Sequence, residues 1–117
     1  KRQTNKGAIM HNKSTLEIHA EAEAVAKQAG EQYIAEHGEP MYCGFAWVDI
    51  APGTSKFARE LKKAGVVRGR SYYGGVDVWN PGGIPTQSMD VKEIAADAYV
   101  KVLGNYGIRA TMMSRAD

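Results

Sequence analysis

The sequence is poor in cysteine, proline and phenylalanine, and it has no long apolar run. One cysteine among 117 residues excludes an intramolecular disulfide framework and favours a reducing compartment. No stretch approaches the ~20 consecutive apolar residues that a membrane-spanning helix needs. The composition, 44% hydrophobic and 24% charged, is that of a globular chain, and the length allows one hydrophobic core. We therefore expect a domain that needs neither disulfide nor metal for its stability.

The chain also lacks a strong excess of either charge, because its formal net charge at neutral pH is only +2. Proteins that bind DNA usually carry far more positive charge. The charge is unevenly distributed: it is +4 over residues 1–13, −5 over 14–40 and +3 over 41–117. One interpretation is a solubilising arm followed by a solvated helix face. The other is that the arm or the body meets phosphate, or that the acidic helix docks on a basic neighbour.

Residues 1–13 show no apolar periodicity, so we predict a flexible basic arm there and a single α+β domain over 14–117. Ser14 and Glu17 have the spacing of a capping box, in which each side chain accepts a hydrogen bond from the other residue's amide. They predict a helix over 15–37, which a glycine and a proline end. The predicted inward stripe of this helix is Ile18, Ala22, Val25, Ala29 and Tyr33.

The order of elements after this helix is β-α-β-β-α-β, the split βαβ pattern of ferredoxin-like domains. Right-handed crossovers give a four-stranded antiparallel sheet of order 4-1-3-2, with both helices on one face. We therefore predict a ferredoxin-like α+β sandwich over residues 41–117 with an added N-terminal amphipathic helix. The predicted elements are strands at 41–50, 66–73, 75–80 and 108–114, and helices near 55–64 and 90–103.

Alternation along the predicted strands assigns their side chains to two faces of the sheet. The small and aliphatic side chains fit under the helices, which leaves Phe45, Trp47, Trp79, Arg109 and Met113 on an open face. The first and third strands are neighbours, so we expect Trp47 and Trp79 side by side. Three occupants of this face remain open: the N-terminal helix, a second copy of the chain, or a nucleotide or nucleic acid stacked on the rings.

One predicted hairpin arm interleaves cations with aromatic rings. Its residues Arg68, Arg70, Tyr72 and Tyr73 suit contacts with phosphates and bases. The alternative is an exposed edge strand that charge protects from pairing. The arm is therefore a candidate ligand-binding segment, although an edge strand protected by charge would show the same residues.

The glycine-containing loop after Trp79 is a second candidate segment. It is able to close over a small ligand, with hydrogen bonds from Asn80, Gln87 and Ser88 and an anion at the following helix N-terminus. The same residues also have ordinary roles in turns and helix caps.

No arrangement of residues stands out as catalytic or metal-binding. Cys43 lies in the most apolar segment, so we expect it to be a buried small hydrophobic residue rather than a nucleophile. His19 and Glu23 are four residues apart on one helix face, but two ligands do not make a metal site. We therefore expect neither metal nor cofactor, and a binding protein rather than an enzyme.

The run YCGFAWVDI…SKFARELKKAG…YYGGVDVWNPGG…QSMDVKE…SRAD resembles small proteins of unassigned function encoded in tailed-phage genomes, over residues 14–117. The resemblance implies a viral protein that acts in a bacterial cytoplasm or in a virion. It implies no activity, and no functional residue is carried over from it.

These observations predict a non-enzymatic, homo-oligomeric, phage-associated protein that binds a nucleotide or single-stranded nucleic acid. One alternative is a structural or protein-binding viral protein, either a virion component or an inhibitor of a host factor. A second is a small phosphate-ester hydrolase that uses His19 with Glu17 or Glu23 and an arginine, Arg109 or Arg115, in one pocket. The predicted ligand-binding residues are Trp47, Trp79, Phe45, Arg68, Arg70, Tyr72, Tyr73 and Arg109.

Overall fold

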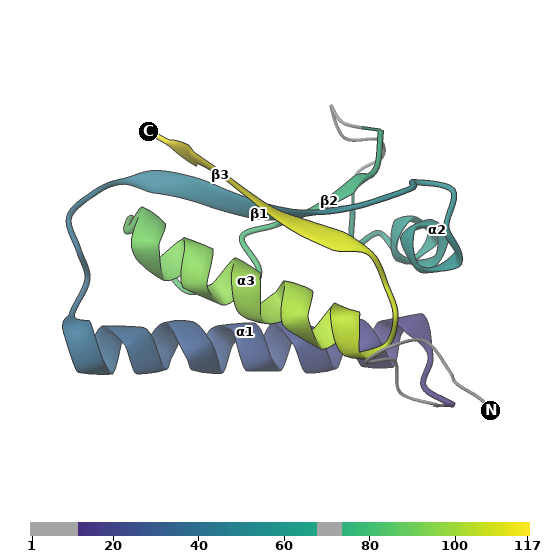
Figure 1. The fold of residues 1–117 in the computed structure, drawn as a ribbon, viewed down its shortest axis with the longest axis horizontal. Coiled ribbons are helices and arrows are strands. Elements are labelled where there is room, and N and C mark those ends of the chain that lie inside the picture. The colour runs from purple at the N-terminus through teal and green to yellow at the C-terminus, as the bar shows by residue number, and fades with distance from the viewer. Residues whose placement is uncertain (1–11, 68–73) are drawn as a thin grey trace.

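The computed structural model describes residues 12–67 and 74–117, and it confirms an α+β protein (Figure 1). The elements in chain order are α1 (Thr15–His37), β1 (Gly44–Ile50), α2 (Lys56–Lys63), β2 (Val76–Trp79), α3 (Met89–Asn105) and β3 (Ala110–Ala116). None of the helices within the described ranges combines the length and the apolar character that crossing a membrane requires.

β1 is the central strand of an antiparallel sheet with the order β2-β1-β3. This order agrees with the predicted neighbours of three of the four strands. The fourth predicted strand covers residues 66–73. Its described residues, Val66 and Val67, form a bend rather than a strand. Residues 68–73 lie outside the described residues. The sheet of the described chain therefore has three strands, and the ferredoxin-like topology stays a prediction.

The first strand is shorter than predicted, because it begins at Gly44 rather than at Met41. Met41 and Tyr42 are exposed, and Cys43 forms only an isolated bridge with Ser88. The prediction that Cys43 is buried is wrong: its side chain is exposed. An apolar neighbourhood in sequence does not bury a residue that lies before its strand begins.

The sheet, α3 and α1 form three successive layers, with α2 at one end of the sheet (Figure 1). α3 packs against β1 and β3 on one side and against α1 on the other. The N-terminal helix therefore does not cover the open face of the sheet, one of the three occupants left open above. It lies on the opposite side of the molecule, behind α3.

α1 begins as predicted, because Ser14 and Glu17 form the complete capping box. Its predicted buried stripe is confirmed at Ile18 and Ala22 and is wrong at Val25, which is exposed. From there the buried positions continue at steps of four, with Ala26 and Gly30. Small side chains allow two helices to approach closely, so α1 packs on a helix rather than on the sheet.

Serine caps the other two helices, Ser55 for α2 and Ser88 for α3, each accepting a hydrogen bond from an amide in the first turn. Tyr99 on α3 is completely buried, and its hydroxyl lies 2.8 Å from His19 Nδ1 on α1. Ile94, on another side of α3, is exposed. The hydrophobic core thus lies on both sides of α3.

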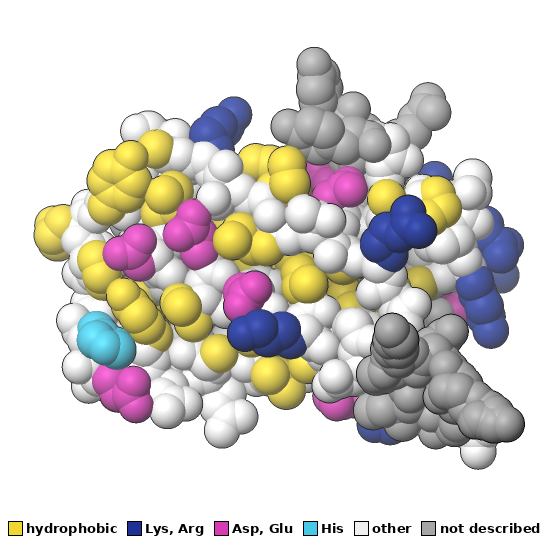
Figure 2. Space-filling model, viewed as in Figure 1, with side chains coloured by type: hydrophobic (Ala, Val, Ile, Leu, Met, Phe, Trp, Pro, Cys, Tyr) yellow, Lys and Arg dark blue, Asp and Glu magenta, His cyan; other side chains and the backbone are white. Residues whose placement is uncertain are grey.

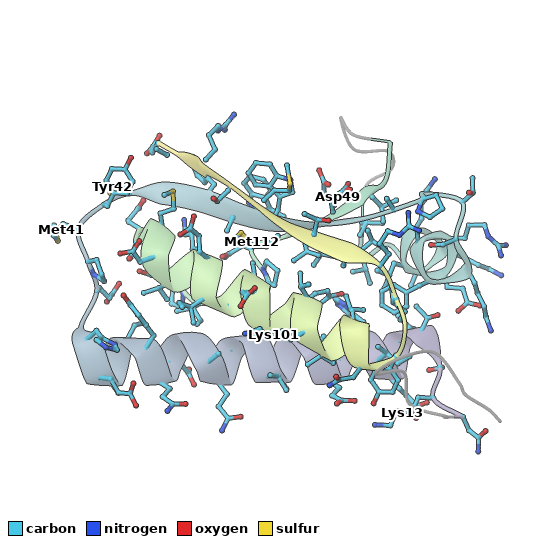
Figure 3. All side chains as sticks on the ribbon, in the orientation of Figure 1. Lys13, Met41, Tyr42, Asp49, Lys101 and Met112 are labelled. Carbon is cyan, nitrogen blue, oxygen red and sulfur yellow. The ribbon has the colours of Figure 1, made fainter. Side chains whose placement is uncertain are left out.

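Lys13, the described end of the predicted arm, contacts the folded part of the chain (Figure 3). Its ammonium lies 3.1 Å from a carboxylate oxygen of Glu21 and 5.7 Å from the centroid of the Tyr106 ring. The flexible arm over residues 1–13 stays a prediction. Residues 1–11 lie outside the described residues.

Candidate functional site

The open face of the sheet carries a row of large side chains across all three strands. Trp47 on β1 pairs with Trp79 on β2 and with Met113 on β3. The two indole rings are stacked, with centroids 5.3 Å apart and an interplanar angle of 19°. Phe45 lies two residues before Trp47 on the same face, and its ring centroid is 5.9 Å from that of Trp79. We call these four residues the aromatic face.

The aromatic face remains accessible on the described part of the protein. Trp79 is 57% exposed, whereas Phe45 and Trp47 are half-buried by their neighbours. Small and aliphatic residues of β1 point the other way, into the core under α3. The predicted separation of two faces, and the predicted contact between the tryptophans, are therefore confirmed. Stacked rings of this kind contribute about 0.5–1.5 kcal/mol beyond the area they bury.

Two cations lie beside the Phe45 ring, near the first residues of β1. Arg115 on β3 is opposite Phe45 in the register, and its guanidinium carbon is 5.6 Å from the ring centroid. Lys92 on α3 places its ammonium 5.1 Å from the same centroid and donates to the carbonyl of Gly44 at 2.9 Å. If the flat part of a ligand stacks on the aromatic rings, an anionic group attached to it can bind these two cations.

Two carboxyl groups lie at the other end of the same face. Asp49 and Asp77 are direct cross-strand partners, and Asp49 marks the end of β1 near α2 (Figure 3). Burial, followed by the charge and hydrogen bond of Asp49, raises the pKa of Asp77 to about 6. One Asp77 oxygen is buried and has no hydrogen-bond partner among the described residues. The face is therefore positive at one end and negative at the other.

The structure brings together three of the eight predicted ligand-binding residues, Phe45, Trp47 and Trp79. Arg109 is not with them, because it precedes β3 and lines a hollow of about 370 Å³ beside the start of α2. Arg109 therefore lies apart from the three rings, and its role in ligand binding stays a prediction. The other four predicted residues, Arg68, Arg70, Tyr72 and Tyr73, lie outside the described residues.

Sequence reasoning missed Arg115 and Lys92. Arg115 has the same strand parity as Arg109, but only the register with β1 shows which arginine lies at Phe45. Strand alternation alone does not give this register, because two arginines of the same parity satisfy it equally. Lys92 reaches the face from a helix, and no local pattern in the sequence indicates such a contact.

The loop after Trp79 is attached to α1 rather than poised over the aromatic face. The amide of Gly82 donates to the Glu23 carboxylate at 2.8 Å, and the Ile84 side chain packs where Gly30 has none. Ser88 caps α3. Gln87 lines a hollow of about 710 Å³ that Cys43 and residues 39–41 also line. The expected closure of this loop over a ligand stays a prediction.

The histidine arrangement expected for a hydrolase is only partly assembled. His19 Nε2 lies 3.9 Å from Glu23, while its Nδ1 faces the buried Tyr99 hydroxyl. Glu17 is used in the capping box, and Arg115 lies on the aromatic face. Burial lowers the pKa of His19, against a smaller opposing effect of Glu23. The predicted convergence of His19, an acid and one of the two arginines is therefore absent from the described residues.

No family model, curated protein or solved structure matches this chain. Within residues 12–67 and 74–117, no three histidine, cysteine or acidic side chains are placed to hold a metal ion.

Proposed function

We propose that the protein is a non-enzymatic binding protein that takes a nucleotide or a single-stranded nucleic acid on its aromatic face. The observation that carries this proposal is the exposed Trp79 ring, stacked on Trp47 and next to a phenylalanine flanked by two cations. A nucleobase is a flat ring that stacks on aromatic side chains, and its phosphate binds arginine and lysine. The face offers both kinds of contact a few ångströms apart.

The magnitudes favour modest affinity and tolerance of base sequence. Each stacked base contributes about 1–3 kcal/mol, and every base has a ring face to offer. With the two cations beside Phe45 as phosphate contacts, log K should fall with log salt at a slope of about −1.4, the single-strand value of about −0.7 for each phosphate. The small net charge of +2 is consistent with a short contact rather than a long electrostatic track.

Tryptophan fluorescence tests this proposal, because both tryptophans belong to the proposed surface. The protein is titrated with the four common nucleotides and with short oligonucleotides, at low and at moderate salt. We expect quenching that weakens as salt increases. Absence of quenching by every ligand in the panel would contradict the proposal.

A pair of variants assigns the effect to the aromatic face. Trp79→Ala should weaken binding by the ~1–3 kcal/mol of one stacked base, about 5- to 150-fold in Kd. Tyr42→Ala removes an aromatic side chain that is similarly exposed, at 60%, but lies outside the aromatic face. It should leave binding unchanged. Equal losses in the two variants would assign binding to another surface.

The alternative role, protein binding in a phage particle or against a host factor, is favoured by one observation. Trp79, Met41 and Tyr42 are large apolar side chains left in solvent, which is typical of protein interfaces. An apolar interface should respond little to salt, whereas phosphate contacts should weaken. The resemblance to tailed-phage proteins supports a site of action in a bacterial cytoplasm or a virion under either role.

A further inference from the structure

β3 forms one edge of the sheet, and its outward backbone groups can be identified residue by residue. The Asp117 amide donates to the Cys43 carbonyl at 3.1 Å, so residues 43 and 117 form a hydrogen-bonded pair. Hydrogen-bonded and non-hydrogen-bonded pairs alternate along antiparallel strands. The backbone groups that point away from β1 therefore belong to every second residue: Ala110, Met112, Ser114 and Ala116.

These outward groups have no backbone partner among the described residues. The edge is seven residues long, its register with β1 is unbroken, and Arg115 is its only charged residue. Natural proteins protect such edges with prolines, bulges or charges, because an unprotected edge pairs with another strand. Apart from Arg115, β3 has none of these, so it is built to accept a further strand.

We propose that this strand is β3 of a second copy, paired antiparallel about a two-fold axis at Met113. In this register Met112 lies opposite Ser114 of the second copy, and all seven residues of each strand are paired. The outward groups of one strand then face the outward groups of the other, as a ladder requires. Two three-stranded sheets become one six-stranded sheet, with both aromatic faces on the same side.

The residues along this register are compatible with their own copies. Met113 meets Met113, and Arg115 lies opposite Thr111, so no like charges are paired. A shift of one repeat toward the start of β3 would set Arg109 against Arg115. A shift in either direction would also leave two residues of each seven-residue strand without a partner. The register through Met113 is therefore the one that the sequence of β3 favours.

The acidic face of α3 opposes this association. Asp90, Glu93 and Asp97 line one hollow with apolar side chains, and Figure 2 shows carboxylates among apolar side chains on this face of the protein. Part of this charge is balanced within each copy, since Lys101 lies 3.1 Å from Asp97 and Ser114 donates to Glu93. Salt screens the remainder, with a Debye length of about 8 Å at 0.15 M and about 3 Å at 1 M.

Molar mass in solution is the direct test. We expect sedimentation equilibrium at both salt concentrations to show a species of twice the 12.7 kDa chain mass. A monomer at both salt concentrations, over the accessible range of protein concentration, would overturn the proposal.

A matched pair of variants locates the interface on β3. Ser114→Pro removes a backbone amide that points away from β1. It should halve the molar mass measured in solution and leave the pairing of β1 with β3 intact. Ser114→Ala keeps this amide and loses the same hydroxyl, so it should remain dimeric. A folded Ser114→Pro that stays dimeric would contradict the interface.

Met113→Lys provides a second route that does not depend on proline. It sets two like charges against each other on the two-fold axis, and it too should give a monomer. The quenching of Trp79 by nucleotides should persist in the Ser114→Pro monomer, because that variant keeps all four residues of the aromatic face. The dimer and the proposed function can therefore fail separately.

Discussion

The amide of Gly82 lies 2.8 Å from the Glu23 carboxylate and fixes the loop between β2 and α3 to the middle of α1. The approach is so close that a Cβ on Gly82 would lie 2.9 Å from the backbone nitrogen of Lys27. Gly82 also has a φ of 86°, which side chains rarely tolerate. This position therefore requires glycine for two independent reasons.

Gly82→Ala should destabilise the protein by more than 2 kcal/mol, roughly the sum of the left-handed backbone conformation and the contact with α1. Gly83→Ala is the matched control: its φ is 62°, but nothing lies within 4 Å of the added Cβ. It should lose only the conformational part, about 1 kcal/mol. Urea unfolding of both variants measures the difference. Similar losses would show that the contact with Lys27 is easily relieved.

Asp77→Asn should stabilise the protein at neutral pH. The pKa of Asp77 is raised in the folded protein, from 3.8 to about 6, so ionisation of Asp77 opposes folding as pH rises through this range. Because the side chain is only partly buried, we discount the shift and expect a gain of about 1 kcal/mol at pH 7. The gain should disappear near pH 4. Thermal unfolding across this range measures it, and a gain that does not depend on pH would contradict the mechanism.

His19 should give the folding stability a pH dependence opposite to that of Asp77. Burial lowers its pKa below the usual 6.5, so the stability from neutral His19 is complete above pH 6.5 and is lost as pH falls through the lowered pKa. His19→Gln should flatten this acid loss, measured as the difference from the parent protein. His37→Gln, at the exposed end of α1, is the control and should leave the loss unchanged. A loss that survives His19→Gln would assign it to other groups.

Arg115→Ala should weaken oligonucleotide binding and reduce the salt slope by about 0.7, the share of one phosphate contact with a single strand. Arg109→Ala removes the same charge from the other end of β3, away from Phe45. It should leave the slope unchanged. Fluorescence titrations at several salt concentrations give both slopes, and equal changes would show that only overall charge matters.

The features that the sequence predicts well are those set by near neighbours in the chain. Ser14 and Glu17 define the start of α1 within four residues, and strand alternation separates Trp47 from the buried side of β1. The contact of Trp47 with Trp79 needed only the expectation that these strands are neighbours. Each of these predictions depends on local spacing or on one common topology.

The features that the sequence did not predict depend on how distant segments dock. The exposure of Cys43 depends on where β1 begins, and just before that point Cys43 bridges to Ser88, 45 positions away. The choice of Arg115 over Arg109 needs the register between β1 and β3. The placement of α1 also depends on small residues: Gly30 leaves room for the Ile84 side chain, and the loop backbone at Gly82 lies against Ala26. A stripe counted along one helix does not show which partner it meets.

The position of α3 between two layers has a consequence for how the protein opens. α1 packs mainly on α3, so it can detach as one unit while the sheet keeps its contacts with α3. The reverse does not hold, because loss of α3 removes the support of both β1 and α1. Native-state hydrogen exchange should therefore distinguish an outer helix, which opens at a lower free energy, from an inner helix, which opens only with global unfolding.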